Sequence, residues 1–418
     1  MTNGLSGSRK QFLDVLRVLA TCAVVLMHVL TGATDVTDAS IVPEYRSLLL
    51  SVMDLVTWCV PIFLLISGYL FLNPERTLTY PVMIKKYCRR IALAILLFGV
   101  PYAASELVVA ERTFRIRMIP EALKMTLTGH TWSHMWYLYL ILFLYLITPL
   151  LKKVLRVLPV WGVAAVMAVI FLGSSVAPFL NKVLDSNSIP VLPDGGVYFL
   201  YYLCGYLFVV REVCVDKGRS VGGQMVEPGS GRRAGDNTEW DGETQNVESR
   251  AWNVWLTTAV AVLALGMILS RTLAGFSIQM AYNYPFTVLL AVLLFAAGQN
   301  GGWRAAALAA SPVAGTPGVD ISTAGEEQER LKHRIPWQEA GALSFAVYLV
   351  HPVYVNLLYK FVKITPFTLL EQCGVQSVAA GHALLIFLLL AFWLLVLALA
   401  TATAWVLRKI PVLRKYVL

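Results

Sequence analysis

Long apolar runs alternate with short polar segments along most of the chain, a pattern that predicts a bundle of membrane-spanning helices. A helix needs about 20 mostly apolar residues to cross the hydrocarbon core of a bilayer. Ten segments approach or exceed that length: 12–32, 49–72, 87–108, 134–151, 159–178, 195–210, 252–272, 282–299, 340–361 and 381–407. We therefore predict an all-α, polytopic integral membrane protein with about ten transmembrane helices, in which residues 1–418 form a single membrane domain.

Two longer polar stretches interrupt this pattern. Residues 212–251 are rich in Gly, Arg, Glu and Asp, and residues 311–338 combine Gly, Pro, Ser and Thr with charged groups. Neither has the apolar periodicity of a helix or a strand, so we predict two flexible loops rather than further domains.

The charge distribution predicts which side of the membrane each segment faces. Of the 34 Lys and Arg residues, 24 fall in the segments on the side of the N-terminus and nine in those on the other side. Because cytoplasmic segments carry the excess of Lys and Arg, we expect both termini and both polar loops to be cytoplasmic. The same distribution accounts for the net charge of +9 without a nucleic-acid partner.

Composition supports a membrane protein and narrows the chemistry. Hydrophobic residues make up 57% of the 418 positions and charged residues only 14%, too few for the surface of a soluble protein of this size. The six cysteines show neither CxxC spacing nor a metal-binding pattern with histidine. There is no phosphate-binding loop, dinucleotide fingerprint, HExxH motif or catalytic pair of carboxylates. We expect no metal site and no permanently bound cofactor.

The first apolar segment contains three ionisable residues, Asp14, Arg17 and His28. Ionisable groups inside a span cost about 2.5–3.5 kcal/mol each on insertion scales, so they call for a function. The 11-residue step from Arg17 to His28 ends about 20° from three full turns, which places both on one helix face about 16 Å apart along the axis. Asp14 is spaced to pair with Arg17. The alternative for Arg17 is contact with lipid headgroups, and for His28 a structural hydrogen bond.

Two further polar groups lie in the fourth and ninth apolar segments. His134, Trp136 and Tyr137 open the fourth segment at the predicted outer surface, either as an interfacial aromatic belt or as the mouth of a site for a hydroxyl-rich ligand. The ninth segment carries Ser344, Tyr348 and His351 on one helix face. These residues either line a path or bond a neighbouring helix, and Pro352 after them predicts a kink.

The inner side offers a small-residue pair and a group of cations. Ser67–Gly68 in the second apolar segment predicts a close contact between helices. Lys86, Arg89 and Arg90 lie where the third segment begins. They are explained either by membrane topology alone or by binding of a phosphorylated cytosolic ligand, for which Lys86 and Arg89 would share a helix face.

Taken together, these segments resemble the acyltransferase 3 family of bacterial membrane O-acyltransferases. The resemblance rests on the ten spans, on the Arg17-x10-His28 spacing, and on the sequences PIFLLISGYLF, KKYCRR, HMWYLYLILFLYLITP and SFAVYLVHP in this order. It covers most of residues 10–400. The family's basic inner motif has two arginines, whereas this chain has Lys86 at the first position and Arg89 at the second.

The resemblance implies transfer of an acyl group, usually acetyl, from cytosolic acyl-CoA to a sugar hydroxyl of a cell-surface glycan. It also implies a multi-pass protein of the bacterial inner membrane, in contact with the lipid bilayer. Arg17, Lys86, Arg89 and Arg90 would hold the donor, with Arg17 counted among the catalytic residues. His28 would deprotonate the acceptor or carry the acyl group. The route between donor and acceptor would be lined by Asp14, Ser67, His134, Trp136, Tyr137, Ser344, Tyr348 and His351.

Two other functions fit parts of the pattern. A proton-coupled transporter would use Asp14, Arg17, His28 and His351 as a permeation path, although no internal repeat of the kind common in transporters is visible. A non-catalytic membrane scaffold would use the polar loops as its output but leaves the three intramembrane polar faces unexplained.

Overall fold

The computed structural model describes residues 3–36, 43–222, 255, 258–267, 281–300, 337–375 and 377–418. Within these ranges the chain is almost entirely helical and contains no β-strand. The predicted all-α class is confirmed. Of the two predicted loops, residues 223–251 and 311–336 lie outside the described residues.

The helices follow the apolar segments in chain order. The first half contains α1 (Asn3–Val36), α2 (Pro43–Val56), α3 (Cys59–Phe71), α4 (Tyr80–Val82), α5 (Arg89–Glu111), α6 (Met118–Leu127) and α7 (Trp136–Val157). The second half contains α8 (Val160–Phe171), α9 (Ala177–Val183), α10 (Gly195–Gly222), α12 (Pro285–Gln299), α15 (Trp337–Asn356), α16 (Pro366–Gln372), α17 (Val378–Lys409) and α18 (Pro411–Tyr416).

Short irregular turns precede or continue several of these helices. Wide π-helical turns cover Met83–Cys88, Leu172–Val176 and Leu357–Phe361, and a 3₁₀ turn covers Ser133–Met135. Such turns change the direction in which the following side chains point. This matters most at Ser133–Met135, because that turn carries a candidate site residue.

Within the described ranges, eight helical segments are long and apolar enough to cross a membrane, and they coincide with eight of the ten predicted spans. They are Gln11–Thr34, Leu48–Phe71, Tyr80–Glu111, Ser133–Val157, Val160–Val183, Gly195–Cys214, Trp337–Gln372 and Val378–Lys409. The other two predicted spans correspond to the shorter apolar helices Thr258–Met267 and Pro285–Gln299. The exact number of crossings and the orientation of the termini stay predictions.

One boundary in the second half differs from the sequence prediction. Helix α10 continues to Gly222, into the segment 212–251 that we predict as a loop. A helix satisfies its own backbone hydrogen bonds, so it need not end where the apolar residues end. The polar composition after residue 211 therefore does not mark the end of this helix.

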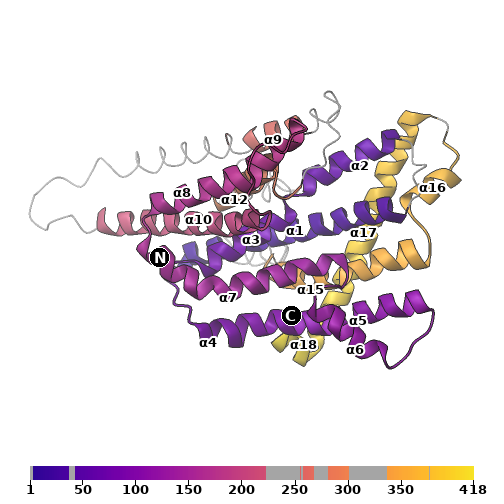
Figure 1. The fold of residues 1–418 in the computed structure, drawn as a ribbon, viewed down its shortest axis with the longest axis horizontal. Coiled ribbons are helices and arrows are strands. Elements are labelled where there is room, and N and C mark those ends of the chain that lie inside the picture. The colour runs from indigo at the N-terminus through magenta and orange to yellow at the C-terminus, as the bar shows by residue number, and fades with distance from the viewer. Residues whose placement is uncertain are drawn as a thin grey trace, which may run out of the picture.

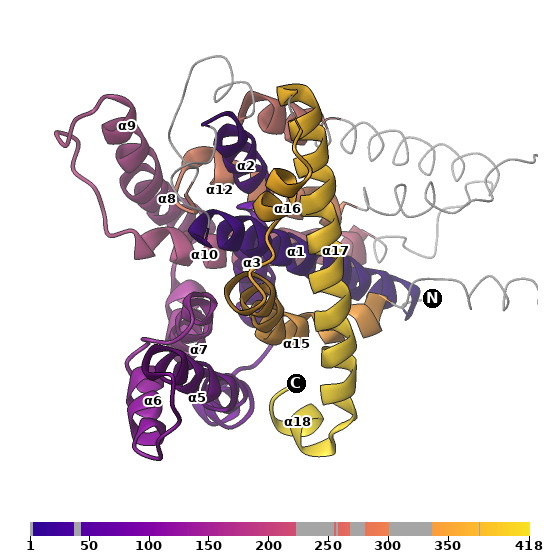
Figure 2. The same cartoon turned by 90° about the vertical axis from the view of Figure 1, so that its right-hand side faces the viewer.

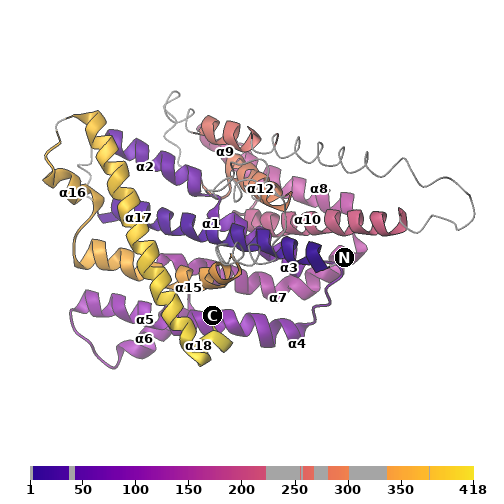
Figure 3. The ribbon, with the colours of Figure 1, turned by 180° about the vertical axis from the view of Figure 1, so that it is seen from behind.

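The helices lie side by side, with α1, α3 and α15 in the middle of the bundle (Figures 1 and 2). Helices α5, α6 and α7 lie on one side, α8 and α9 on another, and α17 crosses the bundle obliquely (Figures 2 and 3). Nearly all of α3 is buried, whereas α17 leaves many large apolar side chains exposed. An apolar exterior of this kind is expected where lipid is the solvent.

The closest backbone approach is where α3 crosses α10. A Cβ atom added at Gly68 would lie 2.0 Å from the Tyr202 carbonyl oxygen, and one added at Gly205 would lie 2.3 Å from the Leu65 carbonyl oxygen. Small residues let helix backbones pack this closely, and packing is the main force between helices in lipid. The close contact predicted from Ser67–Gly68 is therefore confirmed.

We expect Gly205→Ala to destabilise the protein, because the added methyl group meets backbone atoms that cannot rotate away. Overpacking of this kind costs roughly 1–3 kcal/mol. The matched control is Gly195→Ala on the same helix, where nothing lies within 4 Å of the added atom. Thermal unfolding of the purified protein in detergent measures both, and equal midpoints for the two variants would contradict the tight crossing.

Candidate functional site

Three histidines from different parts of the chain meet in the middle of the bundle. The ring centroids of His28 on α1 and His351 on α15 are 4.8 Å apart. His134, on the 3₁₀ turn before α7, lies 6.3 Å from His28 and 5.8 Å from His351. The sequence places these residues in three separate segments, and the fold combines them into one cluster, which we call the histidine cluster.

Parallel packing of α1 against α15 holds two of these rings together. An added Cβ at Gly341 would lie 2.9 Å from Asp14, and one at Gly32 would lie 2.8 Å from Val355. The two glycines thus permit close contact at both ends of the paired segment, and His28 and His351 face each other between them.

Each of these two rings is oriented by its own helix. The Nδ1 atom of His28 lies 2.9 Å from the Val24 carbonyl oxygen, and that of His351 lies 3.2 Å from the Val347 carbonyl oxygen. A carbonyl only accepts, so these contacts place the ring proton on Nδ1 and leave Nε2 with a free lone pair. The arrangement presents Nε2 as a proton acceptor or nucleophile.

The three rings differ in their access to small molecules. His134 and His351 are 3% and 0% exposed, and the Nε2 atom of each is buried without a hydrogen-bond partner. His28 is only half-buried. Buried polar atoms without a partner are rare in folded proteins and call for an explanation. Here they lie beside the one accessible ring, as expected if a ligand completes the cluster.

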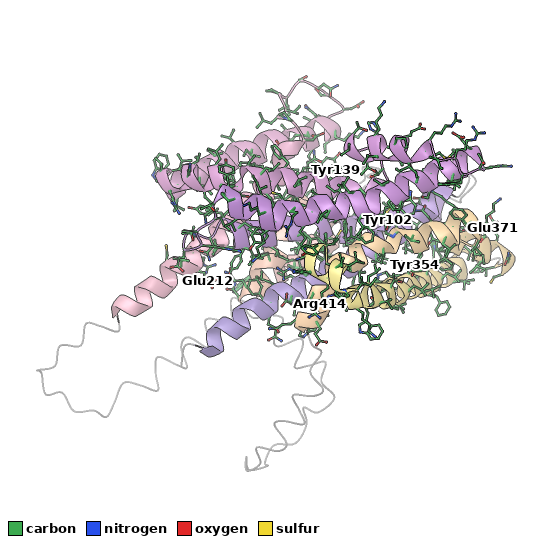
Figure 4. All side chains as sticks on the ribbon, turned by 90° about the horizontal axis from the view of Figure 1, so that it is seen from below. Tyr102, Tyr139, Glu212, Tyr354, Glu371 and Arg414 are labelled. Carbon is green, nitrogen blue, oxygen red and sulfur yellow. The ribbon has the colours of Figure 1, made fainter. Side chains whose placement is uncertain are left out.

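Aromatic residues surround the histidine cluster, and two of them were not predicted. Tyr102 on α5 stacks on Trp132 at a centroid distance of 4.2 Å, and its hydroxyl donates to the Leu349 carbonyl at 2.6 Å. Tyr348 donates to the His134 backbone carbonyl. Figure 4 labels Tyr102 on the ribbon. Tyr102 follows Pro101 and is a lone tyrosine in an apolar run. The sequence therefore does not indicate its role.

A row of hydroxyl groups connects the cluster with the Arg17 end of the bundle. The Tyr137 ring lies 5.9 Å from that of Tyr348. The hydroxyls of Tyr137 and Tyr145 both contact the buried Ser67 side chain. Tyr145, which the sequence analysis missed, is in turn close enough to Arg17 to interact electrostatically. Ser67 and Tyr137 therefore belong to this row, and their role in lining a path stays a prediction.

Arg17 and Asp14 form the predicted pair. Their side chains are 2.6 Å apart, and the Arg17 side chain is 30% exposed. The Thr21 hydroxyl bonds the Arg17 carbonyl on the same stripe. Arg17 lies on α1 well away from His28, about 16 Å along the axis for an 11-residue step, so the two residues lie at different levels of the bundle.

The inner cations are arranged differently from the prediction. Lys86 lies in the π-helical turn Met83–Cys88, so the α-helical spacing that would place Lys86 and Arg89 on one face does not apply. Lys86 lies over the Tyr87 ring and Arg89 over the Tyr416 ring. Arg90 donates through Nε to the Val417 carbonyl at 2.8 Å, and also to Leu418. Two donors of Arg90 thus hold the residues that follow α18.

Trp136 and Ser344, two of the predicted path residues, make other contacts. Trp136 packs with Tyr198 and Tyr282 at centroid distances of 5.3 and 5.8 Å, in an aromatic group at the start of α7. The Ser344 hydroxyl bonds the Ala340 carbonyl of its own helix at 3.2 Å. Among the residues that the structure describes, no group of His, Cys, Asp and Glu is arranged to hold a metal ion.

We expect the three histidines of the cluster to differ from one another, and from His130, in their reactivity toward diethyl pyrocarbonate. This reagent acylates accessible neutral imidazole. The exposed His130 should react fastest, His28 more slowly, and the buried His134 and His351 slowest. Peptide mass spectrometry of the protein modified in detergent measures the order. Modification of His134 or His351 as fast as that of His130 would contradict the closed environment of these two rings.

Comparison with known proteins identifies the family. The sequence model of the acyltransferase 3 family, described as an acyltransferase domain, matches residues 10–409. No curated protein and no solved structure matches the chain. The matched range includes all three histidines of the cluster, Arg17 and the inner cations. The chain therefore belongs to the acyltransferase 3 family of membrane acyltransferases.

Proposed function

We propose that this protein is an O-acyltransferase that moves an acyl group, most often acetyl, from cytosolic acyl-CoA to a hydroxyl group of a cell-surface glycan or its lipid-linked precursor. The inner membrane of a bacterium is the corresponding location. The observation that carries the proposal is the histidine cluster, in which the accessible His28 keeps Nε2 free beside two buried rings. The family match favours this chemistry over the transporter alternative.

His28 is the base in the proposed reaction. Its Nε2 takes the proton of the acceptor hydroxyl while the hydroxyl oxygen attacks the thioester carbonyl. The tetrahedral intermediate then collapses, the C–S bond breaks, and the CoA sulfur takes the proton back from the imidazolium. Atoms and charge balance without a further reactant. General-base help of this kind contributes about 10²–10⁴-fold to a rate.

The neighbouring rings support this step through position. His351 packs edge-on against His28 at 4.8 Å, and the Tyr348 hydroxyl fixes the turn that carries His134. Rings packed in this way keep the base in one orientation. This favours a fast reaction, because a small misplacement of a catalytic group lowers the rate.

The donor would reach His28 from the Arg17 end. The phosphates of CoA carry the negative charge that Arg17, Lys86 and Arg89 would bind. The extended pantetheine arm matches the route of about 16 Å between Arg17 and His28 along α1. Tyr145 and Tyr137 contact Ser67, and Tyr145 also interacts with Arg17. In this proposal the three hydroxyls would bond the amides of that arm.

We expect His28→Ala to lower acetyl transfer by about 10²–10⁴-fold without loss of folding. The measurement is CoA release from labelled acetyl-CoA by the purified protein, with thermal unfolding as the check on structure. His130→Ala, an exposed histidine outside the cluster, is the matched control. Label bound covalently to wild type but absent from the variant would make His28 an acyl carrier, whereas full activity in His28→Ala would refute its role.

Arg17→Ala should raise the KM for acetyl-CoA by about tenfold or more with a smaller effect on kcat, since a hydrogen bond to a charged group is worth roughly 1.5–3 kcal/mol. Arg156→Ala, which removes an exposed arginine at the end of α7, is the control for loss of charge. An unchanged KM would assign Arg17 to the Asp14 pair and to lipid.

A further inference from the structure

A basic pocket lies where α17 ends and α18 begins. Its volume is about 550 Å³, and it is lined by Arg408, Lys409, Pro411, Arg414 and Lys415. Four of these five residues are cations. The pocket lies outside the histidine cluster and the hydroxyl row. Because Arg89 lies over the Tyr416 ring of α18, the pocket is close to the cations proposed to bind CoA, so a test has to distinguish a lipid from the donor.

Within the part of the chain that the structure describes, no carboxylate pairs with the cations of this pocket. The Nε atom of Arg408 is buried without a hydrogen-bond partner, and Arg408 is close enough to Arg90 for the two cations to repel each other. Membrane topology explains the presence of Lys and Arg at an inner helix end. It does not explain a concave group with a buried unpartnered donor, which favours a bound anion.

Apolar side chains beside the pocket indicate the kind of anion. Trp405, Ile410 and Val412 are all exposed, and the Lys409 ammonium lies over the Trp405 ring. Tryptophan paired with a cation is typical of the boundary between headgroups and acyl chains. A ligand that carries phosphate next to hydrocarbon would contact both the cations of the pocket and the apolar side chains beside it. A water-soluble phosphate compound would leave these apolar side chains uncovered.

The position of α18 supports the same conclusion. Because α17 crosses the bundle obliquely, α18 lies along the side of the bundle rather than beyond its end (Figures 1 and 3). Arg90 of α5 fixes it there through the Val417 carbonyl. Figure 4 places Arg414 on α18, away from the ends of the bundle where Glu212 and Glu371 lie. The pocket therefore borders the surface that lipid covers.

We propose that this pocket binds the phosphate of an anionic phospholipid headgroup, with the lipid's acyl chains against Trp405, Ile410 and Val412. Arg408 and Arg414 provide forked donors that match phosphate oxygens, and Lys409 and Lys415 add charge. The site holds one lipid at the side of the bundle.

The test uses the full chain in a neutral detergent and measures thermal unfolding with added phosphatidylglycerol or phosphatidylcholine. A ligand that binds only the folded state raises the unfolding midpoint. We expect phosphatidylglycerol to raise the midpoint of wild type and phosphatidylcholine to leave it unchanged. The double variant Arg408→Gln/Arg414→Gln should lose more than half of that rise.

The matched control is Lys153→Gln/Arg156→Gln, which removes the same charge from exposed positions at the end of α7 and should keep the full rise. An equal loss in both doubles would show a general charge effect and overturn the pocket. A second outcome would also overturn the proposal. If CoA raises the unfolding midpoint of wild type but not of the pocket double, and phosphatidylglycerol raises neither, the pocket belongs to the donor. Should the pocket double fail to fold, Arg414→Gln is compared with Arg156→Gln by the same criterion.

Discussion

The close parallel contact between α1 and α15 is the constraint on which the site depends. Gly341 and Gly32 permit it at its two ends, and His28 and His351 are brought to 4.8 Å between them. The same contact presents Tyr348 to the turn of His134, so a change in the distance between these two helices would alter all three rings. The other helices enclose this pair and keep its polar groups away from lipid.

A polar side chain in an apolar bundle needs a partner, and this chain provides it locally. His28, His351, Thr21 and Ser344 all bond carbonyls one turn back in their own helices. For a hydroxyl such as that of Ser344 this local bond satisfies the donor. For an imidazole it satisfies one nitrogen and leaves the second, so the same device that makes a histidine tolerable in the bundle also sets its tautomer.

The sequence predicts the fold well, because hydrocarbon thickness limits the length of each apolar run and so marks each helix. It also finds the Asp14–Arg17 pair and all three histidines, since ionisable groups stand out against an apolar background. It cannot predict that the histidines meet, because that depends on which helices are neighbours. Tyr102 and Tyr145 are missed for the same reason, and the shared face of Lys86 and Arg89 fails because the π-helical turn at Met83–Cys88 departs from α-helical spacing.

The row of hydroxyls between Arg17 and the histidine cluster has a bioenergetic consequence. Hydroxyls and imidazoles in sequence are the groups along which protons move, and this row lies beside α1, whose segment Gln11–Thr34 is long and apolar enough to cross a membrane. A net transfer of one charge across the whole field is worth about 2.3 kcal/mol per 100 mV. If the base in the proposed reaction exchanges its proton with one side of the membrane through this row, its position partway along α1 couples its protonation to part of the membrane potential.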